Sequence, residues 1–266
     1  MLLMNLRSRF HGRLQRSAAR HLARRRFPIE NAVPLISFTF DDFPRSALLE
    51  GGAILTRFGL RGTYYASFGL MGQTGPTGEI FVPRDLDVLL VQGHELGCHT
   101  FSHCHSWDTK SHVFEDSIAR NEEARMKLIP GVPFKTLSYP ICPPRPRIKR
   151  TAAAHFAGCR GGGETFNVGT IDLSHLAACF LEKSRLDAGA PRMLIERNRR
   201  ARGWLIFATH DIATNPTPYG CTPSFFKDVV TAAVSSGGRI LPVGEALECL
   251  RGEPGNPGGA EPGPWG

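Results

Sequence analysis

The sequence predicts a single α/β domain built on a parallel sheet, open or closed into a barrel. Its length of 266 residues suits one large core, and its 41% hydrophobic and 21% charged residues are ordinary for a globular protein. Short apolar runs alternate with helical patterns along the chain, as repeated strand and helix units require. A chain of this size buries roughly three quarters of its unfolded surface, so it needs no disulfide support.

Strands are expected where short runs are apolar or rich in residues that favour strands, and helices where apolar residues recur at helical spacing. The expected strands are residues 35–40, 63–67, 94–100, 134–139, 155–159, 204–209 and 239–242. The expected helices are residues 46–58, 83–92, 112–129, 191–201, 223–236 and 243–250. In such a sheet the catalytic groups gather at the carboxyl ends of the strands.

The start of the chain is a basic arm. Residues 1–29 hold eight arginines and no acidic residue, and the other 24 basic residues balance all 24 acidic ones, so the net charge of +8 belongs to the arm. Its apolar residues recur every four positions and predict an amphipathic helix: Leu6, Phe10, Leu14, Ala18 and Leu22. This helix can pack on the body, lie on an anionic membrane surface or act as a presequence, and nucleic acid is its least expected partner.

The body of the fold is expected from residue 30 to residue 251. Ten of the fifteen residues from 252 to 266 are glycine or proline, which predicts a disordered tail. No apolar segment suits a secretory signal, so we expect a cytoplasmic protein, with the inner face of the membrane as an alternative. The seven cysteines form no Cys-x-x-Cys pair, and their odd number favours a reducing compartment. Cys98 and Cys104 are expected to be small buried residues rather than metal ligands.

Carboxylates and imidazoles follow three of the expected strands. Asp41 and Asp42 follow the first, His99 and His103 follow the third, and His210 follows residues 204–209. A hydrolytic zinc site takes three protein ligands and keeps one position open for water, and it accepts both histidine and carboxylate. If the groups meet at one edge of the sheet, they predict a metal-dependent hydrolase.

The motifs around these residues resemble a known family. Thr-Phe-Asp-Asp at residues 39–42, His-Thr-Phe-Ser-His at 99–103 after Gly-His-Glu-Leu-Gly at 93–97, and Phe-Ala-Thr-His-Asp at 207–211 resemble the polysaccharide deacetylases of the NodB-homology type, carbohydrate esterase family four. The similarity in order and spacing covers roughly residues 35–245. It implies a distorted (β/α) barrel in a single domain.

The resemblance also implies a role for each residue. Asp42, His99 and His103 would hold a divalent metal, with Zn²⁺ expected first and Co²⁺ or Ni²⁺ as alternatives. Asp41 would be the general base, and His210 the acid that protonates the leaving amine. Asp172 and Asp211 are both candidates for orienting His210.

Two family motifs are altered here. The third usually reads Arg-Pro-Pro-Tyr, in which the Arg holds the catalytic Asp and the Tyr backbone N–H completes the oxyanion hole, but residues 138–141 read Ser-Tyr-Pro-Ile. We expect Arg145 or Arg147 to replace the missing Arg, and the N–H of Ile141 to serve the oxyanion. The expected substrate-binding residues are Tyr139, Pro140 and Ile141.

The fourth motif, Asp-x-x-Asp-Trp, has no match between residues 161 and 180, where Asn167 and Asp172 are the candidate substitutes. Phe43 stands where the family commonly has Gly and is expected to narrow the mouth of the site. These changes point to a divergent subgroup.

The function expected from the sequence is removal of N-acetyl or O-acetyl groups from an amino-sugar glycan or a glycan precursor. Removal of an N-acetyl group would break a C–N bond that is not a peptide bond. The expected partner is a carbohydrate. Two alternatives are a hydrolase of a non-sugar amide or ester on the same fold, and a catalytically impaired protein that binds metal and carbohydrate.

Overall fold

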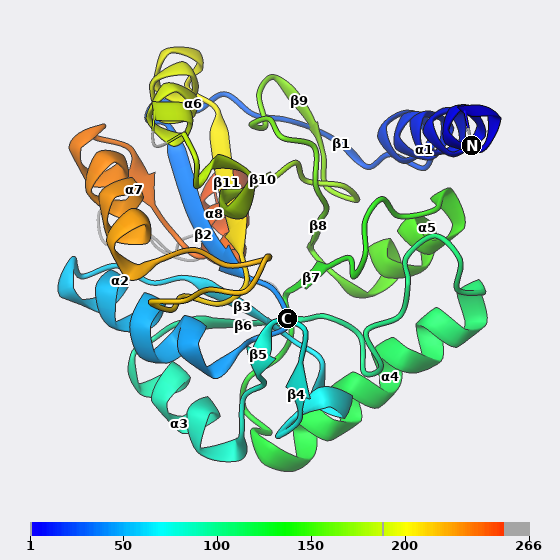
Figure 1. Ribbon diagram of the computed structural model, residues 1–266, viewed down its shortest axis with the longest axis horizontal. Helices are drawn as coiled ribbons and strands as arrows, with labels where there is room; N and C mark the ends of the chain where they lie inside the picture. Colours follow the sequence, from blue (N-terminus) through cyan, green and yellow to red (C-terminus); the bar gives the residue numbers. More distant parts are fainter. Residues whose placement is uncertain (1, 188, 253–266) are drawn as a thin grey trace.

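A computed structural model describes residues 2–187 and 189–252, with side chains from residue 12 onward. Its main sheet is parallel throughout and curls around the centre of the molecule (Figure 1), in the order β10-β11-β2-β3-β6-β7-β8, with β12 also paired to β2. The strands are β2 (Leu35–Phe40), β3 (Thr63–Ala66), β6 (Glu95–Cys98), β7 (Thr136–Ser138), β8 (Gly158–Arg160), β10 (Cys179–Phe180), β11 (Trp204–Thr209) and β12 (Arg239–Ile240). The predicted α/β barrel type is confirmed as a curled, open half-barrel.

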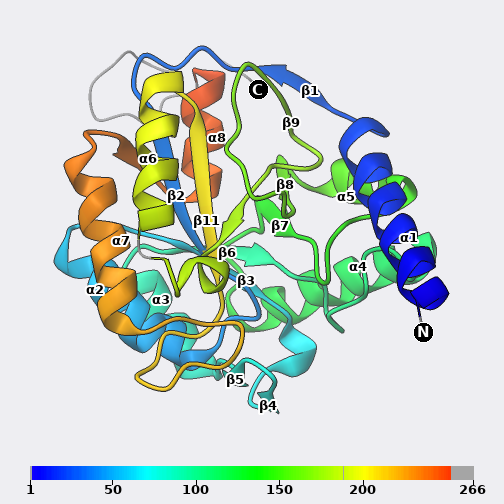
Figure 2. The ribbon, with the colours of Figure 1, turned by 45° about the horizontal axis from the view of Figure 1, so that its top comes forward.

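Helices cover the outside of this sheet (Figure 2). They are η1 (Ala47–Gly52), α2 (Ala53–Arg57), α3 (Pro83–Val91), α4 (Ser111–Leu128), α5 (Pro146–His155), α6 (Gly189–Ala201), α7 (Pro223–Ser235) and α8 (Val243–Arg251). Short 3₁₀ turns are η2 (Phe68–Leu70) and η3 (Leu181–Ser184). All six predicted helices are present, with ends shifted by a few residues. The strand predicted at residues 155–159 begins later, because α5 extends to His155.

The two central strands show why the sequence forms this sheet. Leu35–Phe40 and Trp204–Thr209 are buried along their whole lengths and pair residue for residue. Both faces of such a strand are covered, so its sequence is nearly all apolar or β-branched instead of alternating. The pairing also places the next residues together, because the Asp41 N–H donates to the Thr209 carbonyl at 2.9 Å. Asp41 and His210 therefore start from neighbouring positions.

The basic arm is docked on the body. α1 (Leu2–His21) packs against α5, and β1 (Arg26–Pro28) pairs with β9 (Thr170–Asp172) (Figure 2). The fully buried Lys149 amine donates to the carbonyls of Ala19 and Leu22 at 2.7 and 2.8 Å, where it satisfies the carboxyl end of α1. Arg25 bonds to the hydroxyl of Ser174 and to the carbonyls of Ala153, Phe156, Ala157 and Leu173.

The packed-helix alternative is thus the one observed, and membrane contact by the arm gains no support. The contact face is not the predicted apolar stripe, because Ala19 is fully buried while Leu14 and Leu22 are 54% and 52% exposed. The side chains of Leu6 and Phe10 lie outside the described side chains, as does the predicted tail from residue 253 onward. The boundary expected at residue 30 cuts through the body, since Ile29 belongs to a core cluster with Leu35 and Trp204.

A small hairpin of β4 (Thr74–Gly75) and β5 (Gly78–Glu79) stands beside the main sheet. All seven cysteines are free, and Cys98 is buried with its sulfur accepting from Asn121 and Thr100, as expected of a small core residue. Within the described residues, no helix is both long and apolar enough to span a bilayer.

Candidate metal and catalytic centre

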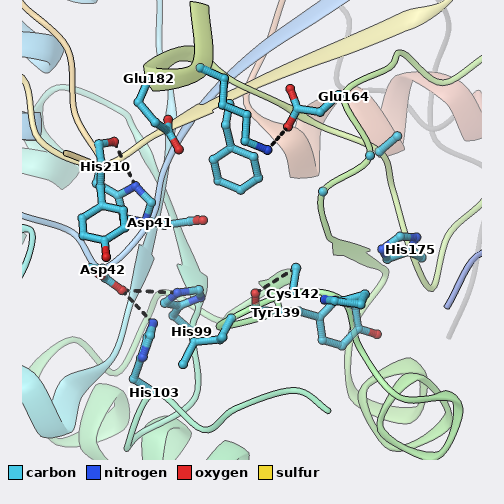
Figure 3. Close-up of a pocket in the computed structure, with 18 of the residues that line it drawn as sticks. Asp41, Asp42, His99, His103, Tyr139, Cys142, Glu164, His175, Glu182 and His210 are labelled. Atoms are coloured by element: carbon cyan, nitrogen blue, oxygen red, sulfur yellow. Dashed lines mark hydrogen bonds and ion pairs between the residues drawn. The ribbon is translucent and has the colours of Figure 1, made fainter. Parts of the chain in front are cut away.

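The backbone after β2 separates two adjacent carboxylates. Asp42 and Phe43 both adopt left-handed conformations, with φ of 62° and 52°, which non-glycine residues rarely do outside functional or tightly constrained sites. The turn sends Asp42 toward the histidines (Figure 3). It leaves Asp41 to accept a hydrogen bond from Ser138, at the end of β7. Phe43 turns into the core and stacks on Phe81 at 4.7 Å between ring centroids, so the expectation that it narrows the mouth is wrong.

Three predicted ligands converge at the carboxyl ends of β2 and β6. The Nε2 atoms of His99 and His103 lie 3.4 and 3.1 Å from Oδ1 of Asp42. One ligand atom from each residue lies within 4.8 Å of the others. Asp42 Oδ1 is buried and has no partner other than these two imidazoles in the described structure, so a cation bound between the three groups would satisfy it.

Other groups fix the orientation of these ligands. Nδ1 of His99 lies 2.8 Å from the carbonyl of Ser138, so Nε2 faces Asp42. The hydroxyl of Thr77 donates to Oδ2 of Asp42 at 3.1 Å and leaves Oδ1 for the cation. His103 reaches the site because its own φ of 49° and that of Thr100, 57°, fold the loop after β6 back on itself. The donor set fits the zinc-type centre that the sequence predicts.

The replacement for the missing motif-three Arg is Arg160, at the end of β8. Its Nη2 contacts both Oδ1 of Asp41 and the hydroxyl of Ser138, and Ser138 in turn donates to Asp41 at 3.0 Å. Arg160 and Ser138 are register partners on β8 and β7, so the guanidinium reaches Asp41 from the neighbouring strand. The small Ser138 side chain leaves room for it.

The ion pair of Arg160 with Asp41 is buried in the protein. Arg160 is 0% exposed, and its guanidinium carbon lies 5.4 Å from the ring centroids of both Tyr65 and Phe180. Burial alone would raise the pKa of Asp41, but the charges of Arg160, His99 and His210 outweigh it and hold the pKa below its usual value. Asp41 is therefore kept ionised, as a general base must be.

Several expected supporting residues act elsewhere. Arg145 donates to the Thr109 carbonyl at 2.7 Å, and neither it nor the exposed Arg147 is among the described partners of Asp41, so that prediction is wrong. Asn167 bonds to the backbone of Ala177 and Trp204 and is structural. Asp172 pairs with Lys149 at 2.7 Å and anchors the arm instead of orienting His210.

His210 is oriented by a loop rather than by a carboxylate. Its Nδ1 lies 3.2 Å from the carbonyl of Tyr219, so an Nδ1–H donor leaves Nε2 facing the cavity. Asp211 shapes this loop, because its carboxylate accepts from the Thr217 N–H at 2.8 Å and its carbonyl accepts from Cys221 at 3.1 Å. Asp211 thus supports His210 through Tyr219, without touching the imidazole.

The sequence reasoning missed Glu182, whose carboxylate faces the cavity beside His210 (Figure 3). One of its oxygens, Oε2, is buried with no partner in the described structure. Burial raises the pKa of Glu182 to about 7, although the His210 charge lowers it in part. Glu182 lies two residues after the end of β10, in η3, so the rule that functional groups lie at carboxyl ends of strands also applies to it. The two-residue strand was too short to be recognised.

Glu182 predicts a specific dependence of stability on pH. Its carboxyl stays protonated up to about pH 7 in the folded protein but ionises near 4.5 in the unfolded chain, so the free energy of unfolding falls as pH rises between these values. Glu182→Gln should remove this loss. The free energy of unfolding of the variant, relative to that of the parent, should therefore be about 1 to 3 kcal/mol higher at pH 8 than at pH 4.5. Urea unfolding at both pH values measures the gain, and an equal difference at both would contradict the prediction.

A cavity of about 1330 Å³ opens beside these groups, with Asp41, Asp42, His99, His103 and His210 in its wall. Tyr139 and Ile141, two of the three residues predicted to bind substrate, also line this cavity. Tyr139 is a buried wall residue whose N–H is already bonded to the Arg160 carbonyl. Pro140 does not line the cavity, because its carbonyl anchors the loop to Ser106.

Ile141 is half exposed at the cavity, and its φ of 48° turns the backbone sharply at this point. Its N–H makes no hydrogen bond to another described residue. It therefore remains the candidate oxyanion donor.

Comparison with known proteins extends these observations. The family model for polysaccharide deacetylase matches residues 30–157. No curated protein matches the sequence. The chitin deacetylase of the fungal pathogen Colletotrichum lindemuthianum has a similar structure, with a TM-score of 0.59 and 17% identity over 82% of this chain and 90% of that one.

A family 4 acetyl xylan esterase from Clostridium thermocellum, solved with cobalt, has a TM-score of 0.56 and 19% identity over 83% of this chain and 93% of that one. A family 4 pseudoenzyme from Bacillus anthracis has a TM-score of 0.57 and 10% identity over 82% and 66%. At these identities the likeness shows a shared fold. The matched family is of the predicted class, deacetylases acting on C–N bonds other than peptide bonds. The predicted resemblance to the polysaccharide deacetylases is thereby confirmed, with the family model covering residues 30–157 of the chain.

Proposed function

We propose that this protein is a metal-dependent deacetylase that removes acetyl groups from the amino sugars of a glycan or a glycan precursor. The observation that carries the proposal is the separation of two neighbouring carboxylates into different tasks. Asp42 joins two histidines in a cluster suited to a cation, and Asp41 is held ionised by a buried guanidinium. An impaired site would have no need to keep a buried arginine on its base.

The residues divide the reaction as follows. Asp42, His99 and His103 would hold a divalent cation, which when bound would supply electrophilic activation of the acetyl carbonyl and of water. Asp41 accepts the proton of the attacking water. The Ile141 N–H donates to the developing oxyanion, since Ile141 lines the cavity and its N–H has no hydrogen-bond partner among the described residues.

The leaving amine then needs a proton. His210 faces the same cavity with Nδ1 committed to the Tyr219 carbonyl, so Nε2 delivers that proton. Glu182 lies beside it in the cavity wall, and the positive charge of the imidazole favours ionisation of the Glu182 carboxyl. Acid and base thus lie on separate groups, on opposite sides of the proton transfer from water to the leaving amine.

The test is release of acetate from N-acetylglucosamine oligomers by protein loaded with Zn²⁺ or Co²⁺. We expect turnover that a chelator abolishes and that added metal restores. An acetyl ester of a neutral sugar assayed in parallel measures any esterase activity. A protein that binds one metal per chain and the oligomer without releasing acetate would instead be the impaired carbohydrate-binding alternative.

A further inference from the structure

The cavity extends well beyond the metal cluster, and its far end is formed by the basic arm. Arg16, Arg20 and Arg24 line the same cavity as Asp41 and His210. Arg16 and Arg20 lie four residues apart on one side of α1, and Arg24 follows in the segment after the helix ends at His21. Figure 3 shows His175 across the cavity from His210, at this end.

The acidic side chains in the cavity wall mostly have cations of their own. Asp172 is paired with Lys149 at 2.7 Å, Glu164 with Lys183 at 2.6 Å, and Asp41 with Arg160. Arg16 and Arg20 have no acidic partner within the described chain, and Arg24 lies only within 4.0 Å of the already paired Asp172. The arm therefore brings an excess of positive charge to this end.

Two buried nitrogens at this end also lack a hydrogen-bond partner, although one of them, Nε of Arg24, is the atom that lies 4.0 Å from Asp172. Nε of Arg24 and Nε2 of His175 are buried without a hydrogen bond to any described group. The Arg24 Nε–H is a donor, and leaving it unpaired costs free energy unless an acceptor arrives. Burial lowers the pKa of His175 to about 4, so the positive charge comes from the arginines.

We propose that the cavity takes an acidic glycan, whose acetylated amino sugar lies at the metal cluster while its carboxylate or phosphate groups bind Arg16, Arg20 and Arg24. This deepens the proposed function and rests on it. Arginine suits both kinds of anion because its planar fork donates two parallel hydrogen bonds. Arginines four residues apart are separated by about 6 Å along the helix, so successive acidic groups of one substrate can be bound.

The first experiment compares substrates of equal length that share the same acetylated sugar. A hexasaccharide of hyaluronan carries carboxylates between its N-acetylglucosamine units, whereas chitohexaose is neutral. We expect kcat/KM for the hyaluronan hexasaccharide to be about tenfold higher and to fall as salt rises, because exposed charges are screened. UDP-N-acetylglucosamine, assayed beside N-acetylglucosamine, tests whether phosphate is the favoured anion.

The second experiment removes the charges. In Arg16→Ala/Arg20→Ala, KM for the acidic substrate should rise about tenfold, while KM for chitohexaose changes less than about twofold. Arg13→Ala is the matched control, since Arg13 lies on the same helix, is exposed and does not line the cavity. It should leave both KM values unchanged.

A binding measurement separates this inference from the proposed function. The dissociation constant of the hyaluronan hexasaccharide for metal-loaded Asp41→Asn protein, with and without the two arginine replacements, requires no turnover. Equal affinity for acidic and neutral hexasaccharides, or equal loss on Arg13→Ala and Arg16→Ala/Arg20→Ala, would overturn the acidic-glycan proposal even if acetate release is observed. Tight, arginine-dependent binding without turnover would retain it and reject the deacetylase function.

Discussion

Arg160→Met should lower the free energy of unfolding at pH 7 by about 3 to 5 kcal/mol, the usual cost of removing one partner of a buried ion pair. Methionine fills much of the space left by arginine but leaves the Asp41 carboxylate buried without its cation. Ser138 still donates one hydrogen bond to Asp41, which cannot replace the charge. Urea unfolding monitored by circular dichroism measures the difference.

The effect of Arg160→Met should depend on pH in a defined direction. The folded-state pKa of Asp41 is depressed, so its contribution to stability is present above the unfolded value of 3.8 and is lost as pH falls through the folded value. The parent and the variant should therefore converge in acid. In the variant, burial without the guanidinium raises the pKa of Asp41, and the acid limb of the rate profile should move to higher pH.

An exchange of side chains provides the matched control for this prediction. Ser138→Arg/Arg160→Ser moves the guanidinium from β8 to its register partner on β7, where the family usually has it. We expect the double variant to recover part of the stability and of the rate that Arg160→Ser alone loses. If Arg160→Ser alone loses neither, the ion pair with Asp41 contributes nothing to the site.

The cluster of Asp42, His99 and His103 was predictable because each of these residues directly follows, or lies in the first turn after, an apolar strand. In a parallel sheet the carboxyl ends of neighbouring strands meet at one edge, so Asp42, His99 and His103 could be brought together from the chain alone. The central strands were predictable for a related reason. Buried on both faces, β2 and β11 are short apolar runs with clear ends.

The residues that support Asp41 were harder to predict, because their positions depend on which residues pair between neighbouring strands and not on the order of the motifs along the chain. Arg160 lies 119 positions from Asp41 and reaches it only because β7 and β8 pair Ser138 with Arg160. No sequence pattern marks that pairing, and an arginine nearer the motif, Arg145, was the simpler choice. The arm is similar, since its docking uses the pairing of β1 with β9 and a buried lysine in α5, a helix that the sequence did not reveal.

Asp41→Asn is expected to have the largest effect on activity, a fall in kcat of about 10² to 10⁴, the range attributed to a general base. Asparagine keeps an oxygen to accept from Arg160 and Ser138 but cannot take a proton from water. KM and the metal content should stay near the parent values, because the ligand atoms belong to Asp42 and the two histidines. The measurement pairs steady-state acetate release with metal analysis of the same sample.

Two controls make this result interpretable. Asp42→Asn should lose the metal as well as the activity, because it changes the carboxylate on which both imidazoles converge.

Asp41→Asn also leaves the Arg160 charge buried without its anion, so the assay must be run well below the melting temperature of the variant. Ser138→Ala, which removes one hydrogen bond to Asp41 and no charge, should cost about 1 kcal/mol and little activity. A folded, metal-loaded Asp41→Asn protein with the parent's rate would exclude Asp41 as the base and leave Glu182, the other cavity carboxylate beside His210, to be tested by the same assay.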